Sequence, residues 1–315
     1  MLRSRPSLAA YGALTAVCVA WGTVYLGIRI ALESFPPTLL MGVRFLAAGI
    51  IVLAISRLLG ARMPSRGEWI RTSCFGIITL GIGVGTLFYA IQWIPSGLAA
   101  MLTTTSPFWM VAIDALIDGG DRPSAPTIGG MLIGLIGALL LVVPGAIQEG
   151  LGGRLFMSFV VLQIGCAAFA LGSILERRHR THAHPIVNAA VQELATGIVF
   201  LIPALAMRES ARWDVRGLAA ISYLIVVGGV IGYSAFLYSM KHLPVSLVSI
   251  YTYVNPAVAV LVGFALYGER FHTIDMIAMA MICAGVVAVN HFSAKEAGQK
   301  SLSELPAIRA QNAPD

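Results

Sequence analysis

Long apolar segments separated by short polar ones dominate the chain. A helix needs about 20 mostly apolar residues to cross the hydrocarbon core of a bilayer. Ten segments qualify, at about 8–30, 36–56, 72–93, 96–117, 126–144, 155–175, 185–206, 217–240, 245–267 and 273–292. Because the apolar positions are continuous rather than alternating, helices are favoured over a membrane barrel. The pattern predicts an all-α integral membrane protein with ten transmembrane helices.

Composition supports the membrane class. Hydrophobic residues make up 57% of the chain and charged residues 11%, with a mean hydropathy of +0.83. A soluble domain carries about 25% charged residues, so this chain could not cover a water-exposed surface. The basic residues behind the net charge of +6 lie mostly between apolar segments. They indicate membrane topology, so the lipid bilayer is an expected partner and nucleic acid is not.

The basic residues are distributed unequally between the two sides of the predicted bundle. With a cytoplasmic N-terminus, 14 of the 21 Lys and Arg residues fall on the cytoplasmic side and 5 on the other. The positive-inside rule therefore predicts an inner-membrane protein with both termini in the cytoplasm. Arg208, Arg212 and Arg216 weigh against this orientation in the second half. The polar tail, residues 294–315, is predicted to be disordered.

The second half of the chain repeats the first. The stretch LFYAIQWIPSGLAAMLTTTSPFW at 87–109 aligns with FLYSMKHLPVSLVSIYTYVNPAV at 236–258, with an offset of 149. Tyr89 aligns with Tyr238, and Pro107 aligns with Pro256. We therefore expect two five-helix repeats, at 1–150 and 151–293.

Five is an odd number of crossings, so the second repeat must enter the membrane from the opposite side to the first. Inverted repeats are typical of secondary transporters, which bind substrate near the midplane between the repeats and expose it alternately to the two sides. An ancient duplication without a transport role is the alternative interpretation.

Several stretches resemble one known family. They are WGTVYLGIRIAL at 21–32, PPTLLMGVRFLAAG at 36–49 and ALYGERFHTIDMIAMAMICAGVV at 265–287. With the proline-bearing spans, they resemble the EamA family of the drug/metabolite transporter superfamily. The resemblance implies ten helices, cytoplasmic termini and transport of small metabolites, most often export. The chain departs from the family in having Ala167-Ala168-Phe169 where related proteins commonly carry a Trp.

Two prolines interrupt corresponding spans. Pro107 and Pro256 each lie about twelve residues into a span, which places them near the bilayer centre. A proline removes one helical hydrogen bond, so we expect a kink or hinge at each. The hydroxyls at 103–106, with Thr252 and Asn255, can satisfy the freed carbonyls. The alternative is a purely structural kink. The substrate-binding candidates from these stretches are Thr104, Ser106, Trp109 and Asn255.

Aromatic residues supply further binding candidates. A deeply placed phenol or indole N–H needs a polar partner, and a cavity that supplies one suits an amphipathic metabolite. The candidates are Trp21, Tyr25, Tyr89, Tyr233, Tyr238 and Tyr251. Core packing is an equally open interpretation for each.

Two charges lie deep in the apolar spans. Arg44 and Glu193 are each about eight residues from opposite faces, or about 12 Å deep. Such charges are usually paired or hydrated. Arg44 is expected to pair with Glu193, to bind a substrate carboxylate or to bond helix ends. Glu193 is the candidate for proton coupling. A facilitative carrier would need no such group.

Glycines and cysteines give less information about function. Gly83 and Gly232 occupy matching positions and indicate close helix packing or a hinge. The four cysteines are isolated within apolar runs and indicate no disulfide or metal site. We find no Walker A or H-E-x-x-H sequence, so no ATP-driven step, cofactor or enzymatic activity is expected.

The sequence therefore predicts a secondary transporter, monomeric or homodimeric, that exports amino acids or related small metabolites across the inner membrane. Alternatives are a broad exporter of cationic drugs and a membrane-embedded enzyme. The six histidines lie at span ends or in loops, which weighs against the enzyme.

Overall fold

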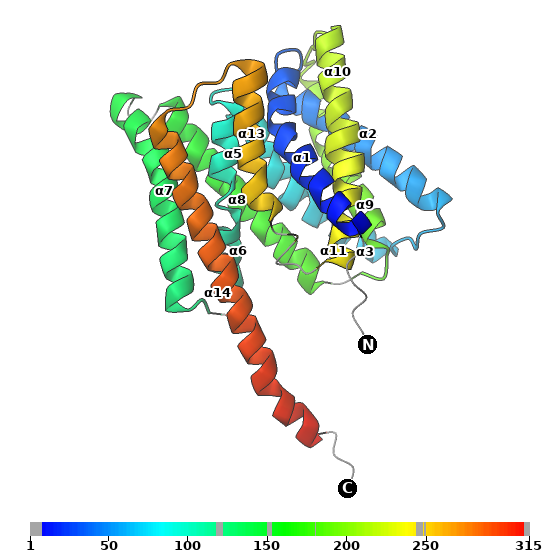
Figure 1. Cartoon of the computed structure of the whole chain (residues 1–315). Coiled ribbons are helices and arrows are strands. Elements are labelled where there is room, and N and C mark those ends of the chain that lie inside the picture. The colour runs from blue at the N-terminus through cyan, green and yellow to red at the C-terminus, as the bar shows by residue number, and fades with distance from the viewer. Residues whose placement is uncertain are drawn as a thin grey trace.

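The chain folds into a bundle of helices that run between two polar ends (Figure 1). The computed structural model describes residues 8–117, 122–149, 153–179, 181–243, 248 and 250–311. The helices of the first half are α1 (Leu8–Ala31), α2 (Pro37–Leu58), α3 (Arg66–Gly76), η1 (Ile77–Val84), α4 (Gly85–Ala90), α5 (Ser96–Thr103), α6 (Ser106–Leu116) and α7 (Ala125–Glu149). Those of the second half are α8 (Arg154–Arg178), α9 (Pro185–Ala206), α10 (Val215–Tyr223), η2 (Leu224–Ile231), α11 (Gly232–His242), α13 (Tyr251–Tyr267) and α14 (Thr273–Gln311).

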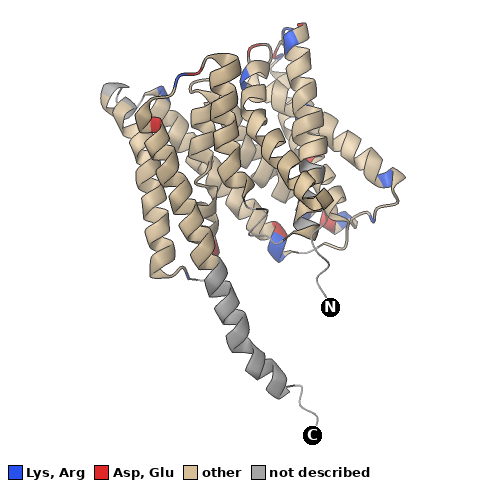
Figure 2. Ribbon diagram, in the orientation of Figure 1, with Lys and Arg blue, Asp and Glu red and all other residues tan. Residues whose placement is uncertain are grey.

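The described helices have the length and composition of membrane spans. Eight of the described helical stretches are long and apolar enough to cross a bilayer, and two shorter apolar helices, Val215–Ile231 and Tyr251–Tyr267, fall at the eighth and ninth predicted spans. Figure 2 shows the charged residues located mainly at the two ends of the bundle. The sequence prediction of an all-helical, multi-pass membrane protein is therefore confirmed.

The helix boundaries follow local sequence signals. Ser65 and Glu68 form a capping box at the start of α3. Pro37 and Pro185 begin α2 and α9, where the missing N–H would have had no partner within the helix. The last helix differs from expectation, since α14 is helical to Gln311, well past the apolar segment. Alanine, lysine, glutamate and glutamine in this tail are good helix formers.

Two π-helical segments interrupt spans that the sequence predicts as regular helices. η1 joins α3 to α4, and η2 joins α10 to α11. They therefore lie in the third predicted span of each half. Short π-helical segments are rare and occur often at functional sites. Both are rich in glycine, with Gly228 and Gly229 in the middle of η2.

The tightest contacts occur in reciprocal pairs. In α2 and α9, a Cβ on Gly49 would lie 2.8 Å from the backbone nitrogen of Leu194. A Cβ on Gly197 would lie 2.4 Å from the backbone nitrogen of Leu46. Upstream of the stretch at 87–109 the two halves align with an offset of 148, as Pro37 does with Pro185, so Gly49 corresponds to Gly197 and Leu46 to Leu194. The contact is therefore repeated with its partners exchanged.

Helices of the two halves are interleaved. α1 packs against α10, η2, α11 and α13 of the second half, and α8 packs against α3, η1, α4 and α6 of the first. α7 and α14 pack along each other, as Figure 1 shows. Since α1 begins and α14 ends at the same end of the bundle, the arrangement fits termini on one side of the membrane. Which side that is stays a prediction.

Candidate functional site

The fourth span is broken in its middle. α5 ends at Thr103, and α6 begins at Ser106 with Pro107 in its first turn. Pro107 cannot donate to the Thr103 carbonyl four residues earlier. The Ser106 hydroxyl donates to that carbonyl instead, at 2.7 Å, and the Cys166 thiol lies 3.8 Å from it. The buried Thr104 hydroxyl donates to Ala100 of its own helix, at 2.9 Å.

Gln163 of α8 holds this break from the other half of the chain. Its side-chain oxygen accepts from the Trp109 indole N–H at 2.9 Å and from the Thr105 hydroxyl at 3.0 Å. Its side-chain nitrogen donates to the Leu102 carbonyl at 3.4 Å. Sequence reasoning gives Gln163 no role, and it gives Thr105 only as one of the hydroxyls at 103–106 that can satisfy freed carbonyls, which Thr105 does by donating to the Leu102 carbonyl at 2.8 Å. The available signal was a lone amide in the apolar segment 155–175.

An aromatic cluster lies beside the break. The Tyr25 hydroxyl is 3.0 Å from the Thr103 hydroxyl, which connects α1 to α5. One turn earlier, Trp21 packs edge-on against Tyr251, with ring centroids 5.2 Å apart. The Trp21 indole donates to the Gly228 carbonyl of η2 at 3.1 Å. The predicted residues Trp21, Tyr25 and Tyr251 are therefore brought together by α1, α13 and η2.

Asn255 lies on the same helix as Tyr251 and is buried. With its amide nitrogen turned toward α1, it donates to the Cys18 carbonyl at 3.1 Å and to the Tyr251 carbonyl at 3.0 Å. Pro256 follows inside α13, which runs unbroken from Tyr251 to Tyr267. A hinge at Pro256 stays a prediction.

Arg44 and Glu193 approach η2 from α2 and α9. Both are buried, with 7% and 6% exposure. The Arg44 guanidinium stacks over the Phe45 ring, 4.7 Å from its centroid. A Cβ on Gly228 would lie 3.5 Å from Arg44 Nη2, and one on Gly229 would lie 3.5 Å from Glu193 Oε1.

These two charges are not closely paired. Among the described residues, no ion pair within 4.0 Å joins Arg44 to Glu193. Arg44 Nη1 and Glu193 Oε2 are buried without a hydrogen-bond partner in the described structure. Buried charges normally have partners, because a buried charge without one destabilises the fold by about 3–5 kcal/mol.

The other predicted site residues lie outside the polar cluster or only pack against neighbouring helices. Tyr89 bonds the Thr38 hydroxyl at 2.8 Å, and Tyr238 is exposed and stacks on His242. The side chain of Tyr233 lies outside the described atoms. Gly83 packs on the backbone of Phe169, and its repeat mate Gly232 packs on Trp21.

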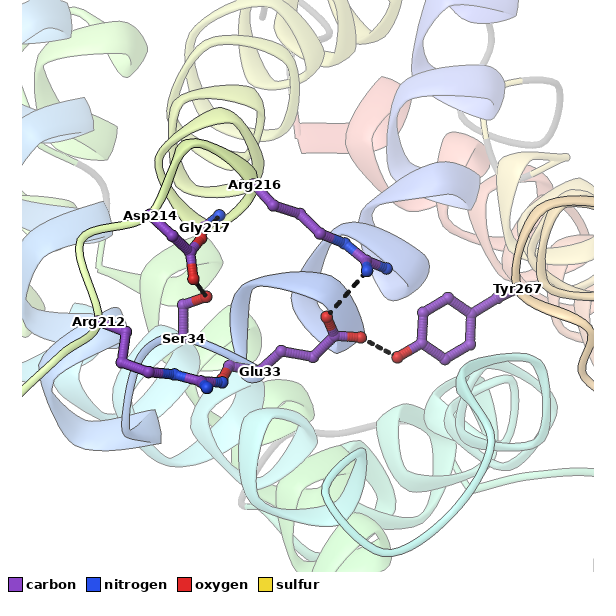
Figure 3. A network of polar contacts seen from close by, with 7 residues as sticks. All are labelled: Glu33, Ser34, Arg212, Asp214, Arg216, Gly217 and Tyr267. Carbon is purple, nitrogen blue, oxygen red and sulfur yellow. Dashed lines mark hydrogen bonds and ion pairs between the residues drawn. The ribbon is translucent and has the colours of Figure 1, made fainter.

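A polar network closes one end of the bundle (Figure 3). Glu33, after α1, accepts from the Tyr267 hydroxyl at the end of α13 and pairs with Arg216 of α10 at 3.4 Å. Asp214 accepts from the Gly217 backbone N–H at 2.6 Å and from the Ser34 hydroxyl at 2.9 Å. These hydrogen bonds lower the pKa of the Asp214 carboxyl from its ordinary value.

The opposite end has its own charged contacts between the halves. Asp114 of α6 pairs with Arg177 at 3.4 Å and with Arg178 at 3.2 Å, both on α8. The polar cluster and the buried charges therefore lie in a bundle that is bridged at both ends.

Comparisons with known proteins agree with this architecture. The family model described as "EamA-like transporter family" matches residues 8–143 and 157–291. An uncharacterized inner membrane transporter, YedA of Escherichia coli, is 34% identical over 91% of this chain and 92% of its own. A probable terminal-alkyne amino-acid exporter of Streptantibioticus cattleyicolor is 24% identical over 88% and 92%. One solved crystal structure aligns with a TM-score of 0.64 at 21% identity, over 91% of this chain and 98% of the other.

Proposed function

Because the chain belongs to the EamA-like transporter family, we propose that it is a secondary transporter that exports amino acids or related small metabolites by alternating access. One observation carries the proposal. The fourth span breaks at mid-length, and Gln163 from the other half of the chain accepts hydrogen bonds from Thr105 and Trp109 at the break. Irregular backbone at membrane depth is tolerated where it is buried in protein or lines a site.

The proposal includes ten spans arranged as two inverted five-helix repeats. The reciprocal Gly49–Leu194 and Gly197–Leu46 contacts support it, because a two-fold relation exchanges the partners of each contact. α7 and α14 repeat this pattern. A Cβ on Gly137 would meet Ala278, and one on Gly285 would meet Gly130. The positions of η1 and η2 in the third span of each half also fit two related units.

The chemistry of the site suits a zwitterionic substrate. Arg44 supplies a buried cation and Glu193 a buried anion, each with an atom that lacks a partner among the described residues. A free amino acid carries the complementary carboxylate and ammonium groups. The Trp21, Tyr25 and Tyr251 rings offer an apolar surface for its side chain. The relative named as an amino-acid exporter supports the same substrate class.

The two alternatives have less support. An exporter of cationic drugs would be served by a buried acid without a buried cation near it, but the Arg44 guanidinium approaches the same segment, η2, as Glu193 does. An enzyme would need convergent acid–base or nucleophilic groups at depth, and all six histidines are exposed. The relatives reported above are named as transporters.

Flux in proteoliposomes tests the proposed function. Purified protein is reconstituted with a panel of labelled amino acids, and exchange is measured against empty liposomes. We expect saturable exchange of at least one amino acid that falls at least tenfold in Arg44→Gln. Arg57→Gln, which removes an exposed arginine at the end of α2, is the matched control. Unchanged exchange in Arg44→Gln would contradict the carboxylate-binding role, and no saturable flux of any amino acid would contradict the proposed substrate class.

A further inference from the structure

A pocket lies away from the Glu33 network, where the α2–α3 connection meets the segment before α9. It is open on one side and has a volume of about 450 Å³. Polar and charged side chains form most of its wall, namely Arg62, Ser65, Glu68, Arg71 and His182. By the predicted topology this end of the bundle faces the cytoplasm, so the pocket lies near the headgroups of the inner leaflet.

Backbone hydrogen bonds hold the two walls together. Glu68 accepts from the His182 N–H at 2.7 Å with one carboxylate oxygen and from the Ser65 N–H at 2.7 Å with the other. The His184 N–H donates to the Arg62 carbonyl at 3.0 Å. The Glu68 carboxylate thus bonds backbone donors from both halves of the chain. These hydrogen bonds hold the two walls of the pocket in place.

The two arginines of the pocket remain available to a ligand. Neither Arg62 nor Arg71 lies within 4.0 Å of a carboxylate oxygen in the described part of the chain. Arg71 is partly buried, and its Nε has no hydrogen-bond partner among the described residues. A buried N–H without a partner is unfavourable by about 1–3 kcal/mol, so an acceptor in the pocket would relieve it. Guanidinium groups bind phosphate oxygens with strong, charge-assisted hydrogen bonds.

Three exposed apolar residues lie near the pocket-lining residues in sequence. Leu58 and Leu59, at the end of α2, are 87% and 77% exposed, and Ile70, next to Arg71, is 69% exposed. Such residues suit contact with acyl chains. A phosphate that enters the pocket from a lipid could therefore keep its chains in the bilayer.

We propose that this pocket binds the phosphate of an anionic phospholipid, with Arg62 and Arg71 as its ligands. Basic pockets between transmembrane helices on the cytoplasmic side are suited to acidic lipid headgroups. The bound lipid joins the α2–α3 connection, at Arg62, to α3, at Arg71, beside the segment before α9.

Native mass spectrometry of the full chain in detergent tests the proposal. The probes are phosphatidylglycerol, phosphatidylcholine and inorganic phosphate. We expect the wild type to bind phosphatidylglycerol more tightly than phosphatidylcholine. The affinity for phosphatidylglycerol should fall about fivefold in Arg62→Gln and about fivefold again in Arg62→Gln/Arg71→Gln. One basic residue near an anionic lipid surface contributes about this factor. Arg57→Gln removes an exposed arginine from the same end outside the pocket and should bind as the wild type does.

The outcomes separate the lipid from other sources of phosphate. Equal binding by the wild type and both pocket variants, or an equal loss in Arg57→Gln, overturns the site. Displacement of the lipid by millimolar inorganic phosphate assigns the pocket to a soluble anion and overturns the lipid proposal. Because Arg62 is exposed, Arg62→Gln should fold normally and keeps the test valid if the double variant does not fold.

Discussion

Gln163 joins the broken fourth span to the second half, so its removal should affect the site more than the fold. In Gln163→Leu, the Trp109 indole N–H loses its acceptor, while the Thr105 hydroxyl keeps the Leu102 carbonyl and loses its link to α8. An unsatisfied N–H at this depth costs about 1–3 kcal/mol. We expect exchange in proteoliposomes to fall at least tenfold, with normal expression. Gln92→Leu, which changes an exposed glutamine, is the control. Full activity in Gln163→Leu would show that Gln163 is not needed for transport.

Glu193 is buried without a close cationic partner, and we expect it to carry the transported proton. Glu193→Gln keeps the shape of the side chain and removes its titration. Substrate accumulation driven by a pH gradient should be lost. Exchange without a gradient should persist at a lower rate, because the substrate ammonium loses its anionic partner. Asp275→Asn, near the end of the bundle, should leave both intact. Gradient-driven accumulation by Glu193→Gln would show that coupling lies elsewhere or is absent.

Individual contacts were only partly predictable from the sequence. Hydropathy gives depth, so the cluster of Trp21, Tyr25 and Tyr251 could be proposed. It does not give the face of a broken helix. For that reason the sequence predicts Thr104 as a contact, whereas the Thr104 hydroxyl bonds its own helix and the neighbouring Thr105 contacts Gln163. Tyr238 is predicted as the repeat mate of Tyr89, but it is exposed.

At the scale of elements, the break between α5 and α6 depends on Pro107. In Pro107→Ala, the restored N–H can bond the Thr103 carbonyl and favour one continuous helix. The fold should therefore be unchanged or more stable. The backbone carbonyl of Thr103 would then be occupied within the helix, and the polar groups at the break would no longer be available to substrate. Exchange should therefore fall about tenfold. Thermal unfolding and flux, measured on the same preparation, check both parts. A fully active Pro107→Ala would show that the break has only a structural role.

The contact between α2 and α9 requires glycine at its centre. A Cβ on Gly197 would lie 2.4 Å from a backbone nitrogen, which cannot move independently of its helix. Overpacking of this kind destabilises by about 1–3 kcal/mol, so Gly197→Ala should unfold at a lower temperature.

Gly129 in α7 is the matched control, because nothing lies within 4 Å of an added Cβ. Gly129→Ala should be neutral or stabilising by up to about 1 kcal/mol through helix propensity. If both variants unfolded at the wild-type temperature, the close approach of α2 to α9 would be wrong.

The spans were predictable as elements because continuous apolar length is a strong signal. The η1 and η2 segments were not, since a π-helical segment has the same apolar composition as an α-helix. At Pro256 the sequence instead predicts a feature that the helix does not have. The proline predicts an interruption, yet α13 accommodates it within a continuous helix.

For the whole molecule, an odd number of spans in each predicted repeat led to the proposed inversion and to a substrate site between the halves. The polar bridges at the two ends could not be foreseen. Glu33 and Tyr267 are 234 positions apart in sequence, and only the packing of α1, α10 and α13 brings them together. These bridges suggest how the two sides of the bundle are opened in turn.

Opening one end must break its polar bridge, so each bridge should control access from its own side. Glu33→Gln removes the charge that pairs with Arg216, and Asp114→Asn does the same for Arg177 and Arg178. An exposed ion pair contributes about 0.2–1 kcal/mol, so each change should shift the population of open states by a factor of roughly 1.4 to 5.

The measurement uses a single cysteine, Ser106→Cys, placed at the break after the four native cysteines are replaced. A membrane-impermeant maleimide is applied to right-side-out and inverted vesicles. Glu33→Gln should speed labelling only from the outside, and Asp114→Asn only from the cytoplasmic side. Because each variant is the other's control, a general loosening of the bundle would speed labelling from both sides in both. That result would contradict separate gates, whereas opposite effects from the two ends are what alternating access requires.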